Sequence, residues 1–315
     1  MSTKPIIAVV GATGAQGGGL VRAILADPEK RFAVRAITRN PESEKGAALA
    51  AQGVSVVAGD ADRPETLGPA FAGAHGAFIV TNFWEHMSAP RELAQAAALA
   101  RATGKAGVQH VVWSTLEDTR KDFPLGTKLP TLGGHYNVPH FDAKGEADAV
   151  FAAEAGPTSY LLAAFYWENF IFFGQGPRRG EDGKLVLALP LGGQKLPGIA
   201  AADIGGAALG IFHRGAAAVG QSFGVAGEVP SGEEMAGSFS RALGEPVAFR
   251  DVPFATARAY GYPGADDMAN MFEYQQLLGP AFLQARSPEL TRSLYPATQD
   301  LDAWLAANAK RVPIG

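Results

Sequence analysis

A glycine-rich turn between an apolar run and a helical pattern constrains the fold of this chain more than any other feature. Residues 6–10 read IIAVV, which is typical of a strand buried on both faces of a parallel sheet. Residues 11–17 follow as GATGAQG, and helically spaced apolar residues come next. Glycine is common here, at 39 of 315 residues, so the pattern alone is weak and an ordinary tight turn is the alternative. Its place between strand and helix predicts a dinucleotide site, with the pyrophosphate against the amino end of the helix.

Strand and helix patterns alternate through the first half of the chain. This alternation predicts right-handed crossovers and an α/β fold with a Rossmann-type, doubly wound parallel sheet. We expect the dinucleotide-binding domain over residues 1–165 and a smaller α+β C-terminal lobe, for substrate or partner, over 166–315, with some later segments returning to the first domain. The expected strands are 6–10, 32–38, 54–58, 77–81, 108–114, 159–163 and 185–189, and the expected helices are 17–26, 44–52, 90–104, 137–155, 201–213, 231–243 and 254–260.

Further strand ends should face the same crevice, because ligands in such sheets bind at the carboxyl ends of the strands. Arg39 follows the second strand, where NAD-binding domains usually place an acid that binds the ribose hydroxyls. A carboxylate would repel a 2′-phosphate, whereas the Arg39 guanidinium can pair with it, so we expect NADP(H); a solvated surface arginine is the alternative. Asp60, after the third strand, could bind the adenine amino group or cap a helix. Thr81, Asn82 and Phe83, after the fourth, could line the nicotinamide ribose.

Composition excludes several other classes of function. The net charge of −4 and the lack of a clustered basic segment argue against direct nucleic-acid binding. Zero cysteines exclude disulfides and thiol chemistry, and the histidines show no metal-ligand spacing, so we expect no metal. No stretch reaches the ~20 uninterrupted apolar residues of a membrane span. We therefore expect a cytoplasmic protein without membrane association.

A long segment, residues 117–139, interrupts the alternation. It contains several prolines and glycines and no clear period, and a loop of this length in a compact domain is usually functional or mobile. The helix expected after it carries His140 and Lys144, which lie four residues apart and so share one face. Ser114 and Thr115 end the strand before it.

Five short motifs occur along the chain in one order. They are GATGAQG at 11–17, TRNP at 38–41, TNFWE at 81–85, HFDAKGE at 140–146 and YWEN at 166–169. Together they are similar to the NmrA-like group of atypical short-chain dehydrogenases, and especially to its Hscarg-type NADPH-sensing members. The similarity continues through PGADDMANMF at 263–272 and so covers nearly the whole chain.

The resemblance implies a Rossmann domain, a smaller C-terminal lobe and NADP(H) between them. Members of this group are mostly regarded as redox sensors that bind protein partners. The pyrophosphate would contact Gly11, Thr13, Gly14, Ala15, Gln16 and Gly17, and Arg39 would hold the 2′-phosphate. Asp60 and Ala61 would lie by the adenine, Thr81, Asn82, Phe83 and Lys144 along the nicotinamide ribose, and Tyr166 and Asn169 over the nicotinamide end.

Active short-chain dehydrogenases carry a tyrosine four residues before the lysine, and here His140 takes that place. The tyrosine normally gives a proton to the carbonyl as hydride arrives. In one interpretation the proton donor is lost and Lys144 survives as a cofactor clamp. In the other, Lys144 or His140 donates the proton itself, since a histidine near neutral pKa is a competent general acid. A surface lysine, and a helix-start histidine bonded to a loop, are the structural alternatives.

Two hypotheses of different classes follow. The first is a regulator that reads the NADPH/NADP balance and changes its protein partner or its homodimer accordingly. Segment 117–139 could order when the cofactor binds and so act as the switch. The second is an NADPH-dependent reductase of a small carbonyl, quinone or aromatic substrate that uses Lys144 or His140. The aromatic run Phe165, Tyr166, Trp167, Phe170, Phe172 and Phe173 could wall such a substrate pocket, or simply form core between the lobes. We favour the sensor, chiefly on the resemblance.

Overall fold

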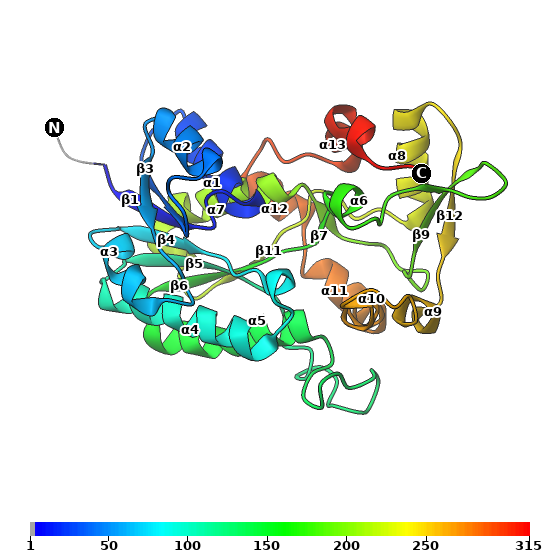
Figure 1. Ribbon diagram of the computed structural model, residues 1–315, viewed down its shortest axis with the longest axis horizontal. Helices are drawn as coiled ribbons and strands as arrows, with labels where there is room; N and C mark the ends of the chain where they lie inside the picture. The colour runs from blue at the N-terminus through cyan, green and yellow to red at the C-terminus, as the bar shows by residue number, and fades with distance from the viewer. Residues whose placement is uncertain (1–3) are drawn as a thin grey trace.

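Seven parallel strands form the central sheet (Figure 1). The computed structural model describes residues 4–315. The strand order is β3-β2-β1-β4-β5-β6-β11, which is the doubly wound order with one strand added beyond β6. The predicted fold class is therefore confirmed, and β1 and β4 lie side by side where the order reverses. The strands are β1 (Ile6–Val10), β2 (Ala33–Thr38), β3 (Ser55–Ala58), β4 (Gly76–Ile79), β5 (His110–Thr115), β6 (Thr158–Leu162) and β11 (Ser222–Gly224).

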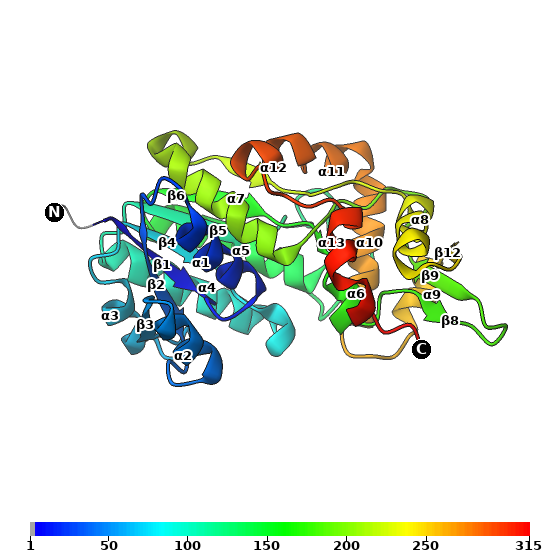
Figure 2. The ribbon, with the colours of Figure 1, turned by 90° about the horizontal axis from the view of Figure 1, so that it is seen from above.

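Helices cover both faces of this sheet, which explains the uninterrupted apolar character of β1. Ile7 and Val9 pack into the core beneath α1 and α7, whereas Ala8 packs into the core beneath α3, α4 and α5. Figures 1 and 2 show α1, α2 and α7 on one side of the sheet and α3, α4 and α5 on the other. The helices are α1 (Ala15–Ala26), α2 (Glu44–Ala51), α3 (Leu67–Phe71), α4 (Ala89–Lys105), α5 (Pro139–Glu154) and α7 (Ala201–Arg214).

The second half of the chain returns to the sheet through α7 and β11. β11 pairs in parallel with β6, and α7 lies directly against α1. Two glycines allow this close crossing. A Cβ on Gly205 would lie 2.1 Å from the backbone nitrogen of Leu20, and one on Gly19 would lie 2.2 Å from the carbonyl oxygen of Ala202. The helix that begins at the glycine-rich turn is thus held in place by a segment about 190 residues later in the chain.

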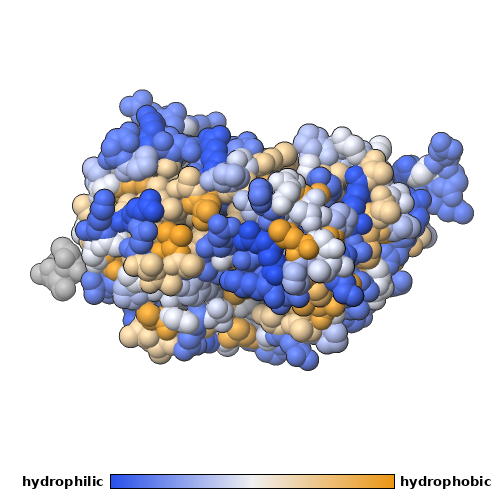
Figure 3. All heavy atoms as spheres, turned by 90° about the horizontal axis from the view of Figure 1, so that it is seen from below, coloured by the Kyte–Doolittle hydropathy of each residue, from blue (hydrophilic) through white to orange (hydrophobic). Residues whose placement is uncertain are grey.

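The second lobe contains two small sheets and a group of helices around an aromatic core. Phe165, Trp167, Phe170, Phe239 and Trp304 are buried together in it. Seen from below, hydrophilic and hydrophobic residues are interspersed over the surface of the molecule (Figure 3). The strands of this lobe are β7 (Phe165–Tyr166), β8 (Arg178–Arg179), β9 (Leu185–Leu189), β10 (Gly198–Ile199) and β12 (Val247–Asp251), and the later helices are α6 (Asn169–Phe172), α8 (Gly232–Leu243), α9 (Phe254–Arg258), α10 (Ala265–Leu278), α11 (Pro280–Gln284), α12 (Pro288–Leu294) and α13 (Leu301–Asn308).

Segment 117–139 is anchored at both ends, although it projects below α5 in Figure 1. The buried Asp142 carboxylate accepts hydrogen bonds from the backbone N–H groups of Thr119 (2.8 Å), Asn137 (2.8 Å) and Val138 (3.0 Å). The Asn270 amide of α10 donates to the carbonyl oxygen of Asn137 at 2.6 Å. Between these anchors residues 124–128 are exposed.

Every strand and helix that the sequence predicted is present, with bounds that differ by at most two residues. The expected strand 77–81 ends at Ile79, so Thr81 belongs to the loop after β4. The sequence patterns predicted neither α3 nor the helices α10 to α13, and the short strand β8 was not predicted either. No helix within residues 4–315 combines the length and the hydrophobicity needed to cross a bilayer.

Candidate cofactor and active site

The glycine-rich turn joins β1 to α1 at the carboxyl edge of the sheet. Gly11 adopts a φ of +66°, a left-handed conformation that favours glycine, and its carbonyl accepts a hydrogen bond from the Gly14 N–H at 2.8 Å. A Cβ on Gly17 would lie 2.4 Å from the Gly11 oxygen, so the turn and the helix can pack this closely only with glycine. α1 begins at Ala15 without a side-chain cap and without an acidic residue in its first turn. Its amino end is therefore available to an anion.

Arg39 lies just beyond β2, as expected, but it already has a partner. Its guanidinium forms an ion pair with Glu85, which lies in the 3₁₀ turn Phe83–Glu85 after β4. Asp60 closes its own turn, since its carboxylate accepts hydrogen bonds from the backbone N–H of Asp62 and from the Arg63 guanidinium, both at 3.0 Å. Asp60 thus makes local contacts, and the N-cap of the following 3₁₀ turn is Arg63. A contact between Asp60 and adenine stays a prediction.

A buried polar cluster joins the loop after β4 to the helices α4 and α5. The Lys144 ammonium donates to the carbonyl oxygen (3.1 Å) and hydroxyl (2.7 Å) of Thr81 and lies 2.9 Å from a carboxylate oxygen of Glu92. The Thr81 hydroxyl in turn donates to Glu92 at 2.6 Å. Lys144 is 9% exposed and Glu92 is fully buried. All three N–H donors of Lys144 therefore have protein acceptors.

The charge on Glu92 is maintained by its neighbours. Burial alone raises the pKa of its carboxyl, but the positive charge of Lys144 and the hydrogen bonds from Thr81 and Lys144 lower that pKa overall. His86 lies 3.4 Å from the second carboxylate oxygen, and its other ring nitrogen accepts a hydrogen bond from the Ser88 N–H. Glu92 is consequently ionised at neutral pH, as a counter-ion for Lys144.

His140 is paired across the two lobes with Asp267. Its Nδ1 lies 2.6 Å from one carboxylate oxygen of Asp267, and its backbone N–H donates to the other oxygen at 3.2 Å. Both side chains are buried. The Trp84 ring lies against the imidazole, with ring centroids 4.8 Å apart. Within residues 4–315 the imidazole Nε2 has no hydrogen-bond partner, so one ring nitrogen is fixed and the other is available.

Tyr166 and Asn169 lie at the entry to the second lobe. The Tyr166 hydroxyl accepts a hydrogen bond from the Gln16 side chain of α1, and burial raises the pKa of this hydroxyl to about 12. It is therefore protonated at neutral pH. Asn169 begins α6. The aromatic run has two environments: Phe165, Trp167 and Phe170 are buried core, whereas Phe172 and Phe173 are 64% and 63% exposed.

The predicted residues therefore gather at one edge of the sheet, together with acids that the sequence analysis missed. Glu92 and Asp267 were not singled out, yet they hold Lys144 and His140. Glu92 could have been found from the sequence, because it lies on the face of α4 that is buried and otherwise mostly apolar. That face also contains Ala89, Ala96, Leu99, Ala100 and Thr103.

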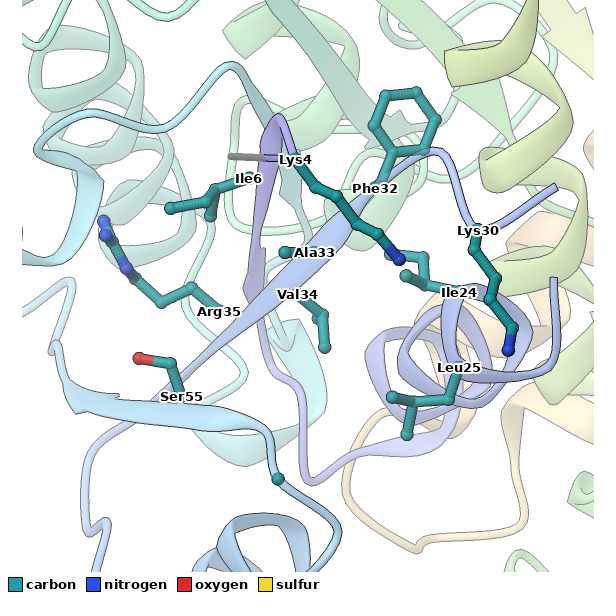
Figure 4. A pocket seen from close by; sticks show the side chains of 11 residues that line it. Lys4, Ile6, Ile24, Leu25, Lys30, Phe32, Ala33, Val34, Arg35 and Ser55 are labelled. Carbon is teal, nitrogen blue, oxygen red and sulfur yellow. The ribbon is translucent and has the colours of Figure 1, made fainter. Parts of the chain in front are cut away.

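A hollow of about 340 Å³ lies at the opposite, amino ends of the strands, where β1 and β2 begin (Figure 4). Apolar side chains such as Ile24, Phe32 and Val34 line it together with Lys4 and Arg35. It contains none of the predicted site residues. The hollow is therefore separate from the candidate site.

Curated relatives of this chain include fungal proteins that are named oxidoreductases. The NmrA-like family domain-containing oxidoreductase FrzB of Cladobotryum sp is 28% identical, over 90% of this chain and 88% of its own length. The similarly named oxidoreductase lnbB of Aspergillus flavus is 30% identical, over 88% of this chain and 85% of its own length.

Solved structures share the whole fold. NmrA, a negative transcriptional regulator solved in complex with NADP, has a TM-score of 0.79 at 23% identity, over 97% of this chain and 95% of that one. The triphenylmethane reductase of Citrobacter sp., solved with NADP(H), has a TM-score of 0.75 at 22% identity, over 96% and 99%. The sequence model of the NmrA-like family matches residues 3–305, and this chain belongs to that family.

Proposed function

We propose that this protein is an NADP(H)-dependent oxidoreductase in which His140 donates the proton to the substrate. The observation that carries the proposal is the pairing of His140 Nδ1 with the buried Asp267 carboxylate, which leaves Nε2 without a protein partner among residues 4–315. An acid fixes the ring orientation and one tautomer in this arrangement, as it does for many catalytic histidines. His140 also occupies the place of the tyrosine in active short-chain dehydrogenases.

Several features support NADP(H) as the cofactor. The uncapped amino end of α1 suits a pyrophosphate, and Arg39 stands where an acid would favour NAD. The resemblance expects Gln16 at the pyrophosphate, Thr81 along the nicotinamide ribose and Tyr166 over the nicotinamide end. The hydrogen bonds from Gln16 to Tyr166 and from Lys144 to Thr81 support this arrangement. NmrA and triphenylmethane reductase, which share the fold, were solved with NADP or NADP(H) bound, and this supports the same cofactor here. When bound, the reduced nicotinamide supplies the hydride.

The protein's own part in the reaction is to supply a proton and a fixed positive charge. The imidazolium form of His140 would be the donor: Nδ1–H stays on Asp267, and the Nε2 proton passes to the substrate oxygen as the carbonyl carbon accepts the hydride. This step leaves a neutral imidazole, and solvent then returns a proton to Nε2. Lys144 has no free N–H donor, because Thr81 and Glu92 take all three. Lys144 therefore acts as a charged clamp beside the ribose. A small carbonyl, a quinone or an aromatic compound is the proposed class of substrate.

The first test is NADPH oxidation, followed by absorbance, against a panel of quinones, aldehydes and aromatic ketones. Lys144→Ala alone is a poor probe, because it leaves the Glu92 carboxylate buried without a counter-ion, at a cost of about 3–5 kcal/mol. We therefore pair Lys144→Met with Glu92→Gln. The double variant should fold and bind NADPH less tightly than the wild type, yet retain measurable turnover at saturating cofactor. Complete loss of turnover with cofactor still bound would identify Lys144 as the proton donor instead of His140.

A redox sensor remains the second candidate function. Its specific support is the ion pair between Arg39 and Glu85, which a 2′-phosphate would have to displace, so cofactor binding changes contacts at the surface. NmrA, which shares the fold, is titled a transcriptional regulator. Tight, NADP-selective binding without turnover of any substrate in the panel would favour this function over the enzyme.

A further inference from the structure

The ion pair between Arg39 and Glu85 joins residues from two strands that flank β1. Arg39 follows β2 and Glu85 follows β4, and β1 lies between these strands in the sheet. The pair therefore crosses the carboxyl end of β1, where the glycine-rich turn begins. The side chains remain partly open to solvent, at 61% and 44% exposure. The guanidinium expected to bind a 2′-phosphate is thus paired with a carboxylate of the protein.

We propose that Glu85 is a specificity-determining residue that competes with the 2′-phosphate of the cofactor for Arg39. This inference rests on the proposed NADP(H) binding. A phosphate dianion must displace the carboxylate from the guanidinium and then lies beside its negative charge, so Glu85 weakens NADP(H) binding. A 2′-hydroxyl makes no such demand, so NAD(H) binding is nearly indifferent to Glu85. Glu85 therefore reduces the preference for NADP(H) over NAD(H) that Arg39 creates.

Other contacts limit what Glu85 can do when it is displaced. The next residue, Trp84, is held between the His140 ring and Gly264, where an added Cβ would lie 2.8 Å from the indole. Phe83 is buried. The turn that carries Glu85 is thus fixed on its inner side. The partly exposed Glu85 side chain can move away from Arg39 without a change in the backbone of the turn. Displacement should therefore cost mainly the ion pair. The carboxylate then stays close to the bound phosphate.

Electrostatic support comes from the surroundings of Arg39. The hydrogen bond with Glu85 is the largest influence on the Arg39 guanidinium and raises its pKa, with smaller contributions in the same direction from the charges of Asp60 and Asp62. Neither aspartate forms an ion pair with Arg39, since Asp60 pairs with Arg63 and Asp62 with Arg91. Glu85 is thus the carboxylate that a phosphate has to replace.

The test compares equilibrium binding of NADPH and NADH to wild type, Glu85→Gln and Glu42→Gln. Glu42→Gln is the matched control, because it removes one negative charge three residues from Arg39 at an exposed glutamate that forms no ion pair among the described residues. We expect Glu85→Gln to tighten NADPH binding about tenfold and to leave NADH binding within about twofold. Glu42→Gln should change both by less than about twofold.

The possible outcomes separate this inference from the proposed function. If wild type binds neither dinucleotide, the proposed function fails and the inference fails with it. In a second outcome the wild type binds NADPH, but Glu85→Gln either strengthens the binding of NADPH and NADH equally or changes the binding of neither. Glu85 then does not compete with the phosphate, although the proposed function stands. In an Arg39→Ala background the gain from Glu85→Gln should shrink to about twofold, because the guanidinium for which the carboxylate competes is gone.

Discussion

His140 and Lys144 lie on one face of α5, but their surroundings give them different capacities. Lys144 is surrounded by acceptors, and its counter-ion Glu92 is fully buried. His140 has a single acid, Asp267, and a free Nε2 among the described residues. The residue that replaces the dehydrogenase tyrosine is therefore also the one with a proton-transfer atom available. The sequence alone had left open which of the two side chains donates the proton.

Asp267 acts through His140 and should be a positioning residue. Asp267→Asn keeps the side-chain volume but removes the charge that fixes the imidazole, so we expect kcat for NADPH oxidation to fall about tenfold or more with little change in NADPH affinity. The pH dependence of kcat should also shift. Asp266→Asn is the control, because Asp266 is the exposed neighbour on the same helix. Equal losses in both variants, or a loss confined to cofactor affinity, would argue against a role through His140.

At the scale of elements, the position of α1 depends on its crossing with α7. Gly205 faces the backbone of α1, where an added Cβ would meet the Leu20 nitrogen at 2.1 Å and the Gln16 oxygen at 2.5 Å. These atoms belong to the helix whose amino end should hold the pyrophosphate. Packing between two distant segments is thereby coupled to the geometry of the cofactor site.

Gly205→Ala should displace α1 and so affect stability and binding together. We expect a loss of about 1–3 kcal/mol in the free energy of unfolding and weaker NADPH binding. Gly237→Ala, inside α8, is the matched control, because its nearest neighbour is the flexible end of Arg241 at 3.5 Å. That change should stabilise the protein by about 0.5–1 kcal/mol and leave binding unchanged. Denaturant unfolding and an NADPH titration measure both effects, and similar results for the two variants would contradict the coupling.

Asp148 gives α5 a pH-dependent attachment to β5. Its carboxylate accepts hydrogen bonds from the Trp113 indole (2.8 Å) and the Thr115 hydroxyl (2.6 Å), but burial is the larger influence and raises the pKa of Asp148 to about 6. The folded state therefore binds this proton more tightly than the unfolded state. The stabilisation is fully present below the unfolded pKa of 3.8 and is lost as the pH rises through about 6.

Asp148→Asn should remove this pH dependence. Relative to the variant, the wild type should lose about 2–3 kcal/mol of unfolding free energy between about pH 4 and pH 7. Denaturant unfolding at several pH values measures the difference. Glu65→Gln, at an exposed carboxylate, is the control and should run parallel to the wild type. Parallel curves for Asp148→Asn and wild type would mean that Asp148 titrates normally in the folded protein.

The helices and strands of the central sheet domain were predicted well from the sequence. Elements were missed where the buried residues do not follow an apolar period. The strands β1 to β6 are short, mostly apolar segments between turn residues, so their existence could be predicted. In α10 the buried face includes Asp267, Asn270 and Gln275, which hides the apolar period of the helix. β11 has only three residues, too few for a pattern.

The same limit applies to the candidate site. Residues that belong to a local motif, such as the glycine-rich turn and Arg39, were predicted in sequence, because the motif fixes their place in the fold. Partners that meet only through tertiary folding were not: Asp267 is 127 residues from His140, and Glu85 is 46 residues from Arg39. No local spacing records such a contact. The acids that tune the site therefore required the structure.

At the scale of the whole molecule, polar contacts connect the two lobes around segment 117–139. Arg286, fully buried before α12, pairs with Glu117 at 2.7 and 2.8 Å and donates to the carbonyl oxygen of Ala163. Tyr274 of α10 donates to Asp122 at 2.7 Å. These contacts attach the segment to both lobes through side chains and backbone of the protein itself. A switch that works by ordering and releasing this segment would have to break them.

The most direct test of the account is NADPH oxidation by wild type and His140→Gln at saturating cofactor, with NADPH affinity measured for both. We predict turnover of at least one quinone or carbonyl substrate by the wild type. We also predict a loss of about a hundredfold or more in kcat for His140→Gln, at nearly unchanged NADPH affinity. Undiminished turnover by His140→Gln would contradict the assigned proton donor. Tight NADPH binding by the wild type without turnover of any substrate would contradict the enzyme and leave the sensor.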